Sequence, residues 1–164
     1  MSWSLFKTKC NVLTGQQHVS KEQFAQTIAS AYHQCVSLHF DTMSGGGKLT
    51  NNAPKLPILN QQILAVCTAN LASHADVDFL KQIGPAFVNY FVGIVITGPT
   101  GVVTITSPGQ WNNVKVPQNL DFQIILNALM ISCRTHIMTL TGTYVSNILP
   151  ISTPWSGALL QSMP

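Results

Sequence analysis

The chain has 164 residues, a length that fits one domain and is long enough to bury a core. Its charged fraction is 8%, against about 25% in an average soluble protein, whereas its apolar fraction of 46% is ordinary. The net charge of +3 comes from scattered Lys and Arg residues, a pattern that excludes a basic patch for nucleic acid. No run reaches the roughly 18 apolar residues of a membrane span, and the opening residues lack the regions of a signal peptide. We therefore expect a soluble protein made in a cytoplasm.

The low charged fraction also predicts that other protein subunits cover much of the surface. A monomer of this size normally carries far more charged side chains to stay in solution. The centre of a protein interface, by contrast, is depleted in charged residues. We therefore expect a protein that works by packing against other subunits.

The first half of the chain predicts two helices. Residues 1–19 are expected to form an extended or irregular arm. Ser20 is a suitable N-cap for a helix from about Lys21 to Ser37, because apolar residues follow it at helical spacing. A Gly-, Asn- and Pro-rich loop over residues 41–57 precedes a second helix over about 59–73.

The middle of the chain predicts a third helix and a β-hairpin. The helix begins at Asp76 or Asp78, and Pro85 is expected to bend it or to end its first part. Two β-branched runs, Val92–Thr97 and Val102–Thr106, flank a Gly-Pro-Thr-Gly turn and predict the hairpin. The helical and strand interpretations compete where the helix meets the first run.

The last third predicts a long apolar helix from Asp121, as its cap, to about Leu140, followed by an extended arm over residues 150–164. The expected fold is therefore a single domain over residues 1–164. It is mainly α with a minor β-hairpin (α+β), and has three to four helices.

One pattern favours a duplicated helix–loop unit, with a chance match as the alternative. Four residues of the first helix recur in the third at an offset of 55, and each copy leads into a β-prone stretch and a Gly-rich loop. The recurring positions are Phe24, Ile28, Ala31 and Tyr32, then Phe79, Ile83, Ala86 and Phe87.

Motifs for phosphate or metal binding are weak. The run Gly45–Lys48 lacks the earlier Gly of a P-loop and has Leu49 where Ser or Thr should follow the Lys, so it is interpreted as a flexible loop. Two Cys/His pairs have a spacing that suits one face of a helix and together would supply a zinc set, but nothing in the sequence brings them together. These pairs are Cys35 with His39 and Cys133 with His136. We expect no metal and no cofactor.

Catalytic residues are equally sparse. The chain has five carboxylates, of which three stand at predicted helix starts and there satisfy free N–H groups. No local nucleophile signature such as GxSxG is present. We therefore expect that the protein is not an enzyme, the alternative being a site assembled from residues that are distant in the sequence.

The residues most suited to an interface are aromatic and aliphatic side chains in non-helical segments. Trp is enriched among the residues that anchor protein interfaces, although it can equally close the edge of its own core. The candidates are Trp3, Trp111, Trp155, Leu159 and Leu160.

The chain resembles small structural proteins of tailed bacteriophages. The similarity consists of few charges, abundant Thr, Asn and Gln, an early helix with Ala31-Tyr32, Gly-rich loops and the ending Trp155–Leu160. It covers the chain as a whole and rests on no specific motif, so no family residue roles are carried over.

This resemblance implies a many-copy subunit of a tail, baseplate or neck, located in a virion that assembles in the host cytoplasm. Its partners would be copies of itself and other virion subunits, with no nucleic acid, membrane or small-molecule substrate. The alternative is a small cytoplasmic protein-binding or adaptor module.

Overall fold

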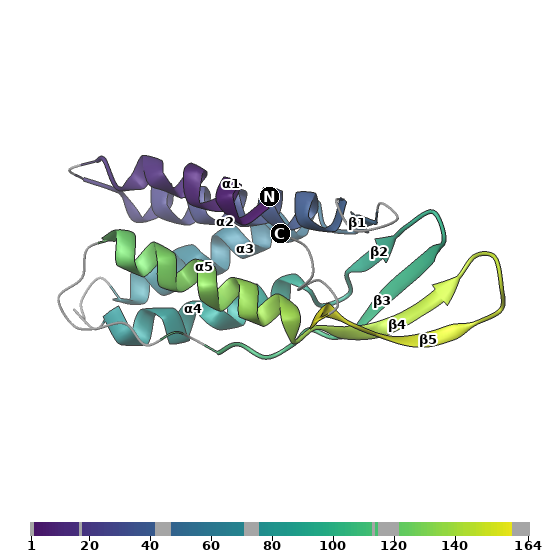
Figure 1. Cartoon of the computed structure of the whole chain (residues 1–164). Helices are drawn as coiled ribbons and strands as arrows, with labels where there is room; N and C mark the ends of the chain where they lie inside the picture. Colours follow the sequence, from purple (N-terminus) through teal and green to yellow (C-terminus); the bar gives the residue numbers. More distant parts are fainter. Residues whose placement is uncertain are drawn as a thin grey trace.

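The protein consists of a group of helices with an antiparallel sheet extending from one end (Figure 1). The structure is a computed structural model, and it describes residues 2–16, 18–41, 47–70, 76–112, 114 and 122–158. The helices are α1 (Ser2–Cys10), α2 (Lys21–Asp41), α3 (Lys55–Asn70), α4 (Asp76–Tyr90) and α5 (Phe122–Met138), with a short 3₁₀ helix η1 (Asn11–Leu13). The strands are β1 (Lys48–Thr50), β2 (Val95–Thr97), β3 (Gly101–Ser107), β4 (Thr141–Ser146) and β5 (Ser152–Ser156).

Helix α2 shows how the local sequence sets an element. The Ser20 hydroxyl accepts a hydrogen bond from the Gln23 N–H at 3.1 Å, which confirms the predicted N-cap. The apolar stripe of α2 is buried, with Ile28 and Tyr32 at 0% exposure. The helix continues to Asp41, beyond the predicted end at Ser37.

Helices α2 and α4 meet through the positions that recur in the sequence. The rings of Phe24 and Phe79 lie 5.8 Å apart, and those of Tyr32 and Phe87 lie 4.7 Å apart, both pairs edge to face. Equivalent residues of the two sequence copies therefore contact one another in the core.

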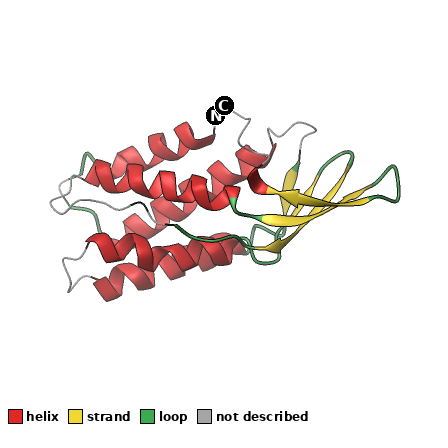
Figure 2. Ribbon diagram, turned by 60° about the horizontal axis from the view of Figure 1, so that its bottom comes forward, coloured by secondary structure: helices red, strands yellow, loops and turns green. Residues whose placement is uncertain are grey.

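The five strands form a meander in which each strand pairs with the next one along the chain. Val103 and Ile105 of β3 are buried, while Thr104 between them is exposed, so the two faces of the sheet alternate in polarity. Seen from another direction, the strands continue beyond the ends of the helices (Figure 2). The sheet is therefore covered at its base and exposed at its far end.

The expectation of a mainly α fold with a minor β-hairpin and three to four helices was wrong. The structure has five α-helices and a five-stranded antiparallel sheet. The predicted hairpin exists as β2 and β3, which pair from Val95 with Thr104 to Thr97 with Val102. It is the centre of a larger sheet, because β1 and β4 pair with its two outer sides.

The expected extended arm over residues 1–19 is also corrected. Residues 2–10 form α1, which packs against α2 and buries Phe6 and Cys10. A helix of nine residues is marginal on its own, so the packing of α1 against α2, rather than helix propensity, stabilises it.

Two predicted boundaries shift around prolines. Helix α3 begins at Lys55, inside the predicted loop, because Pro57 then falls in the first turn, where its missing N–H costs nothing. Pro85 neither ends nor divides α4, which runs unbroken from Asp76 to Tyr90. The side chains of Asp76, Asp78 and Asp121, predicted as caps, lie outside the described residues.

Candidate functional site: an uncharged sheet with an apolar tip

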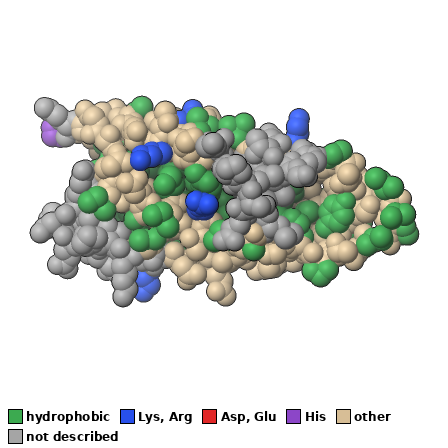
Figure 3. Space-filling view, in the orientation of Figure 1, with side chains coloured by type: hydrophobic (Ala, Val, Ile, Leu, Met, Phe, Trp, Pro, Cys, Tyr) green, Lys and Arg blue, Asp and Glu red, His purple; other side chains and the backbone are tan. Residues whose placement is uncertain are grey.

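Charge is distributed unevenly over the molecule. Residues 82–114 and 135–164 contain no Lys, Arg, Asp or Glu, and these two stretches include strands β2 to β5 in full. Among the five strands, the only charged side chain is that of Lys48 in β1. On the face shown in Figure 3, the blue Lys and Arg side chains are absent from the far end of the sheet, where green hydrophobic side chains gather.

The exposed large aliphatic side chains of the described sheet lie at the end of β4 and in the turn between β4 and β5, over residues 145–151, here called the hairpin tip. Four of its seven residues are large, exposed aliphatic residues: Val145 at 47%, Ile148 at 73%, Leu149 at 55% and Ile151 at 46%. Exposed aliphatic side chains that occur singly are normal, whereas large contiguous apolar patches are typical of surfaces that bind other molecules.

Hydrogen bonds give the hairpin tip a defined shape. The Ser146 hydroxyl accepts from the N–H groups of Ile148, at 3.1 Å, and Leu149, at 3.3 Å. The tip is also tied to the β2–β3 turn, because the Thr100 carbonyl accepts from the Asn147 N–H at 3.0 Å and from the Tyr144 hydroxyl at 2.8 Å. The exposed aliphatic side chains are therefore presented on an ordered turn.

The outer edge of β5 is poorly suited to pairing with another strand. The Ser146 N–H donates to the Ile151 carbonyl, and the Gly157 N–H donates to the Leu140 carbonyl. In an antiparallel pair of strands, opposite residues alternate between hydrogen-bonded and non-hydrogen-bonded pairs. Counting from these two bonds, Thr143 and Pro154 form a non-hydrogen-bonded pair, so the nitrogen of Pro154 points away from β4. Because proline has no N–H, the outer edge lacks a donor there, a common way of blocking edge-to-edge association.

A groove lies along α4 in the helical part, here called the α4 groove. It has a volume of about 490 Å³. Its lining consists of Lys81, Pro85, Val88, Asn89, Val92 and Trp111.

Trp111 forms one wall of the α4 groove because it is fixed against α4. Its ring stacks on Phe87 at 5.3 Å, and its Nε1–H donates to the Leu80 carbonyl at 2.9 Å. Gly84 allows this approach, since a Cβ there would lie 2.2 Å from the indole. The wall is therefore rigid.

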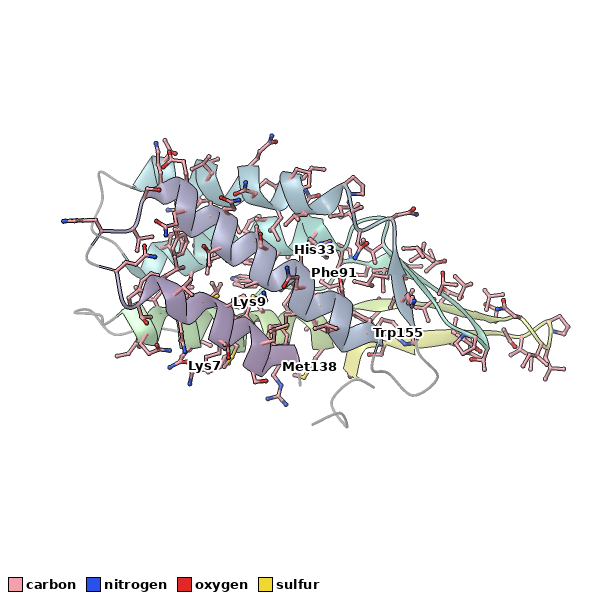
Figure 4. All side chains as sticks on the ribbon, turned by 90° about the horizontal axis from the view of Figure 1, so that it is seen from above. Lys7, Lys9, His33, Phe91, Met138 and Trp155 are labelled. Atoms are coloured by element: carbon pink, nitrogen blue, oxygen red, sulfur yellow. The ribbon has the colours of Figure 1, made fainter. Side chains whose placement is uncertain are left out.

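A polar cluster joins the helices to the base of the sheet. The Tyr90 hydroxyl and His33 Nδ1 share a hydrogen bond of 2.7 Å, and the Asn52 side chain donates to the Ser37 hydroxyl at 3.1 Å. Burial lowers the pKa of His33 and raises that of Tyr90, so both groups are neutral. In Figure 4, His33 lies within the group of helices. No described carboxylate hydrogen-bonds to these residues, and the cluster is explained by its role in fixing α2 against α4.

His136 is fully buried in α5, and its Nε2–H donates to the Pro108 carbonyl at 2.7 Å. Its Nδ1 has no hydrogen-bond partner within the described part of the chain. Burial lowers the pKa of His136, and the hydrogen bond to Pro108 offsets this only in part. The neutral imidazole packs against Phe91 and Trp111.

Three cysteines share the core, contributed by α1, α2 and α5. Burial, together with the nearby Cys35 thiol, raises the pKa of Cys10 to about 12. Burial likewise raises the pKa of Cys133. These thiols remain protonated at neutral pH, and a protonated thiol is neither a nucleophile nor a metal ligand.

The described side chains do not bring together the two Cys/His pairs whose spacing suits zinc. Among the described residues, no group of three or more Cys, His, Asp or Glu side chains lies close enough together to hold a metal ion. The Nε2 of His136 is already engaged with Pro108, and the side chain of His39 lies outside the described residues.

The structure places the predicted interface tryptophans against the protein's own core. Trp3 packs edge to face on Phe6, and Trp111 stacks on Phe87. Trp155 is only 8% exposed and lies at the base of the sheet (Figure 4), so its ring does not project as an anchor. Leu159 and Leu160 lie outside the described residues.

Sequence reasoning missed the hairpin tip, although a signal was present. The run Thr141–Ser146 is rich in β-forming residues, and Ser152–Ser156 follows after a short Asn- and Pro-bearing turn. The prolines of residues 150–164 indicated an extended arm rather than an edge strand.

The chain matches no protein-family model, and neither curated proteins nor solved structures give a match. Within the described residues, no helix has both the length and the apolar character needed to cross a membrane.

Proposed function

We propose that this protein is a non-catalytic structural subunit of a multi-subunit assembly, and that the assembly is a tailed-phage virion in which it forms part of the tail, baseplate or neck. Its partners are copies of itself and other virion subunits. The observation that carries the proposal is the hairpin tip, which presents four exposed aliphatic side chains at the end of an uncharged sheet.

The hairpin tip is an exposed apolar surface. Exposed aliphatic surface is unfavourable in water, and burying one Ile or Leu side chain stabilises a contact by about 1.5–3 kcal/mol. The flanking strands carry no charge that would have to be desolvated on association. A partner that covers the tip therefore gains burial at little electrostatic cost.

The chemistry of the buried groups supports a non-catalytic role. The Cys10 and Cys133 thiols are kept protonated by burial, and the one neutral His–Tyr pair among the described residues has no carboxylate beside it. The virion part of the proposal rests on the composition and the resemblance to phage structural proteins.

Size-exclusion chromatography with light scattering, followed by negative-stain imaging of the peak, tests the proposal. A ring or another defined oligomer with regular symmetry is the expected result. A protein that stays monomeric over a wide range of concentrations, and forms no particle, would contradict self-assembly.

The isolation of the apolar tip favours a second candidate, a protein-binding or adaptor module. Such a protein would present one apolar patch to one partner and would remain a monomer on its own. The same measurement separates the two candidates.

A further inference from the structure

We infer that the hairpin tip of one copy docks into the α4 groove of a neighbouring copy, so that copies associate head to tail. The inference rests on the proposed function, because it names the contact through which the subunit assembles. It identifies the partner of the tip as a second copy of this chain.

The tip and the groove match in chemistry. The tip contributes only uncharged side chains, and the wall of the groove that faces solvent consists mainly of Pro85, Val88, Val92 and the ring of Trp111. The polar members of the groove, Lys81 and Asn89, can bind backbone carbonyl groups, which a turn presents in excess. No like-charge contact opposes docking.

They also match in size. A cavity of about 150 Å³ is enough to hold a benzene molecule, which is comparable in size to an aliphatic side chain. The groove, at about 490 Å³, has room for two or three such side chains. Three exposed aliphatic residues of the tip, Ile148, Leu149 and Ile151, supply that number.

The groove cannot be filled by the tip of its own chain. The tip lies at the far end of the sheet, directed away from α4 (Figure 1). The Thr100 carbonyl also holds Asn147 and Tyr144 against the β2–β3 turn, which keeps the tip in its projecting position. A tip that docks in this groove must therefore come from another copy.

The alternative self-contact, edge-to-edge pairing of β5 strands, is disfavoured by Pro154, whose nitrogen faces the outer edge. The tip and the groove are different surfaces, so their contact is heterologous and generates a ring or a filament rather than a closed dimer. Each copy takes part in two contacts, one through its tip and one through its groove. A stable contact buries about 800 Å² on each partner. The uncharged surface beside the tip would contribute to this area.

Two complementary variants test the inference. In the tip variant, Ile148→Asp and Leu149→Asp place charge on exposed turn residues. In the groove variant, Val92→Asp places charge at a residue that is 49% exposed, so the fold should be retained. The matched control is Val12→Asp, because Val12 is 56% exposed but lies in η1. Circular dichroism verifies that each variant is folded.

Analytical ultracentrifugation of each protein, and of the two variants mixed in equal amounts, is the measurement. We expect the wild type and the Val12→Asp control to form oligomers, and each charge variant alone to be monomeric, with affinity reduced at least about tenfold. The mixture should form a dimer and nothing larger, because only the intact tip of the groove variant can enter the intact groove of the tip variant.

Other outcomes would overturn the inference in distinguishable ways. If the tip variant still forms the wild-type oligomer, assembly uses another surface, so the proposed function stands and the inference fails. If both variants are monomeric but the mixture stays monomeric too, the tip does not enter the groove. A wild type that is monomeric at every concentration contradicts both the inference and self-assembly.

Discussion

The helical part and the far end of the sheet handle their apolar residues in opposite ways. In the helical part, residues such as Tyr32, Phe87 and Phe91 are buried, and charged side chains lie on the outside. At the hairpin tip, Ile148 and Leu149 are exposed on an ordered turn, and the strands that carry them have no charge. The far end of the sheet therefore combines exposed aliphatic side chains with an absence of charged residues, and it lacks a covering layer of its own.

The largest expected effect is a difference in the free energy of unfolding between substitutions in these two regions. Phe91 is fully buried between Phe40, Tyr90 and His136, so Phe91→Ala should lower the free energy of unfolding by about 3–5 kcal/mol. Ile148→Ala also truncates a large apolar side chain, but on an exposed turn, and should change the free energy of unfolding by less than about 0.5 kcal/mol. Urea denaturation of both variants under monomeric conditions measures the difference. Equal losses would show that the tip is part of the core.

The next effect concerns the close packing of the strands. A Cβ at Gly142 would lie 2.4 Å from the Thr104 carbonyl oxygen, so Gly142→Ala should force β3 and β4 apart and destabilise the fold by about 1–3 kcal/mol. Gly15→Ala is the control, because no atom lies within 4 Å of the Cβ it would add. Thermal unfolding compares the two. Unchanged stability of Gly142→Ala would contradict the β3–β4 register.

A smaller effect is a pH dependence that originates in the helical part. Burial lowers the pKa of His136, and of the less buried His33, below 6.5. As the pH falls below 6.5, the unfolded chain binds protons that the folded chain does not, so stability is complete above this value and decreases below it. The slope is at most about 1.4 kcal/mol per pH unit for each fully buried histidine.

Urea midpoints at about pH 8 and about pH 5.5 measure this dependence, which His136→Gln should reduce and His18→Gln, at an exposed position, should not. A protein that is more stable at the lower pH would contradict the burial of His136.

The smallest expected effect is that of salt on association. Surface ion pairs weaken as ionic strength rises, whereas apolar contacts do not. Because the hairpin tip and its flanking strands are uncharged, oligomerisation should be unchanged or slightly stronger at high NaCl. Sedimentation at low and high NaCl checks this, and dissociation at high salt would indicate a contact between charged surfaces instead.

The sequence allowed the core helices to be predicted better than the sheet. Ser20 as an N-cap and the stripe with Ile28 and Tyr32 specify α2 locally, because capping and 3.6-residue periodicity depend on neighbours in the chain. Strand β4 depends on pairing with β3, a partner about 40 residues away, and no local pattern specifies that register. Strand β5 in turn pairs with β4.

The candidate site was harder still to predict. Trp111 and Trp155 have the residue type that anchors interfaces, yet Gly84 leaves room for the Trp111 ring against α4, and Trp155 is buried. The aliphatic residues of the hairpin tip were ordinary in the sequence, and their exposure follows from the length by which the sheet extends past the helices.

Hydrogen–deuterium exchange at a series of protein concentrations tests most directly whether the uncharged end of the sheet is the assembly surface. As oligomers form, peptides covering residues 145–151 should become more protected, together with those covering 81–92 of the α4 groove. Peptides covering the exposed residues of η1 should not change. Oligomer formation without added protection at 145–151, or no concentration dependence at all, would contradict the account.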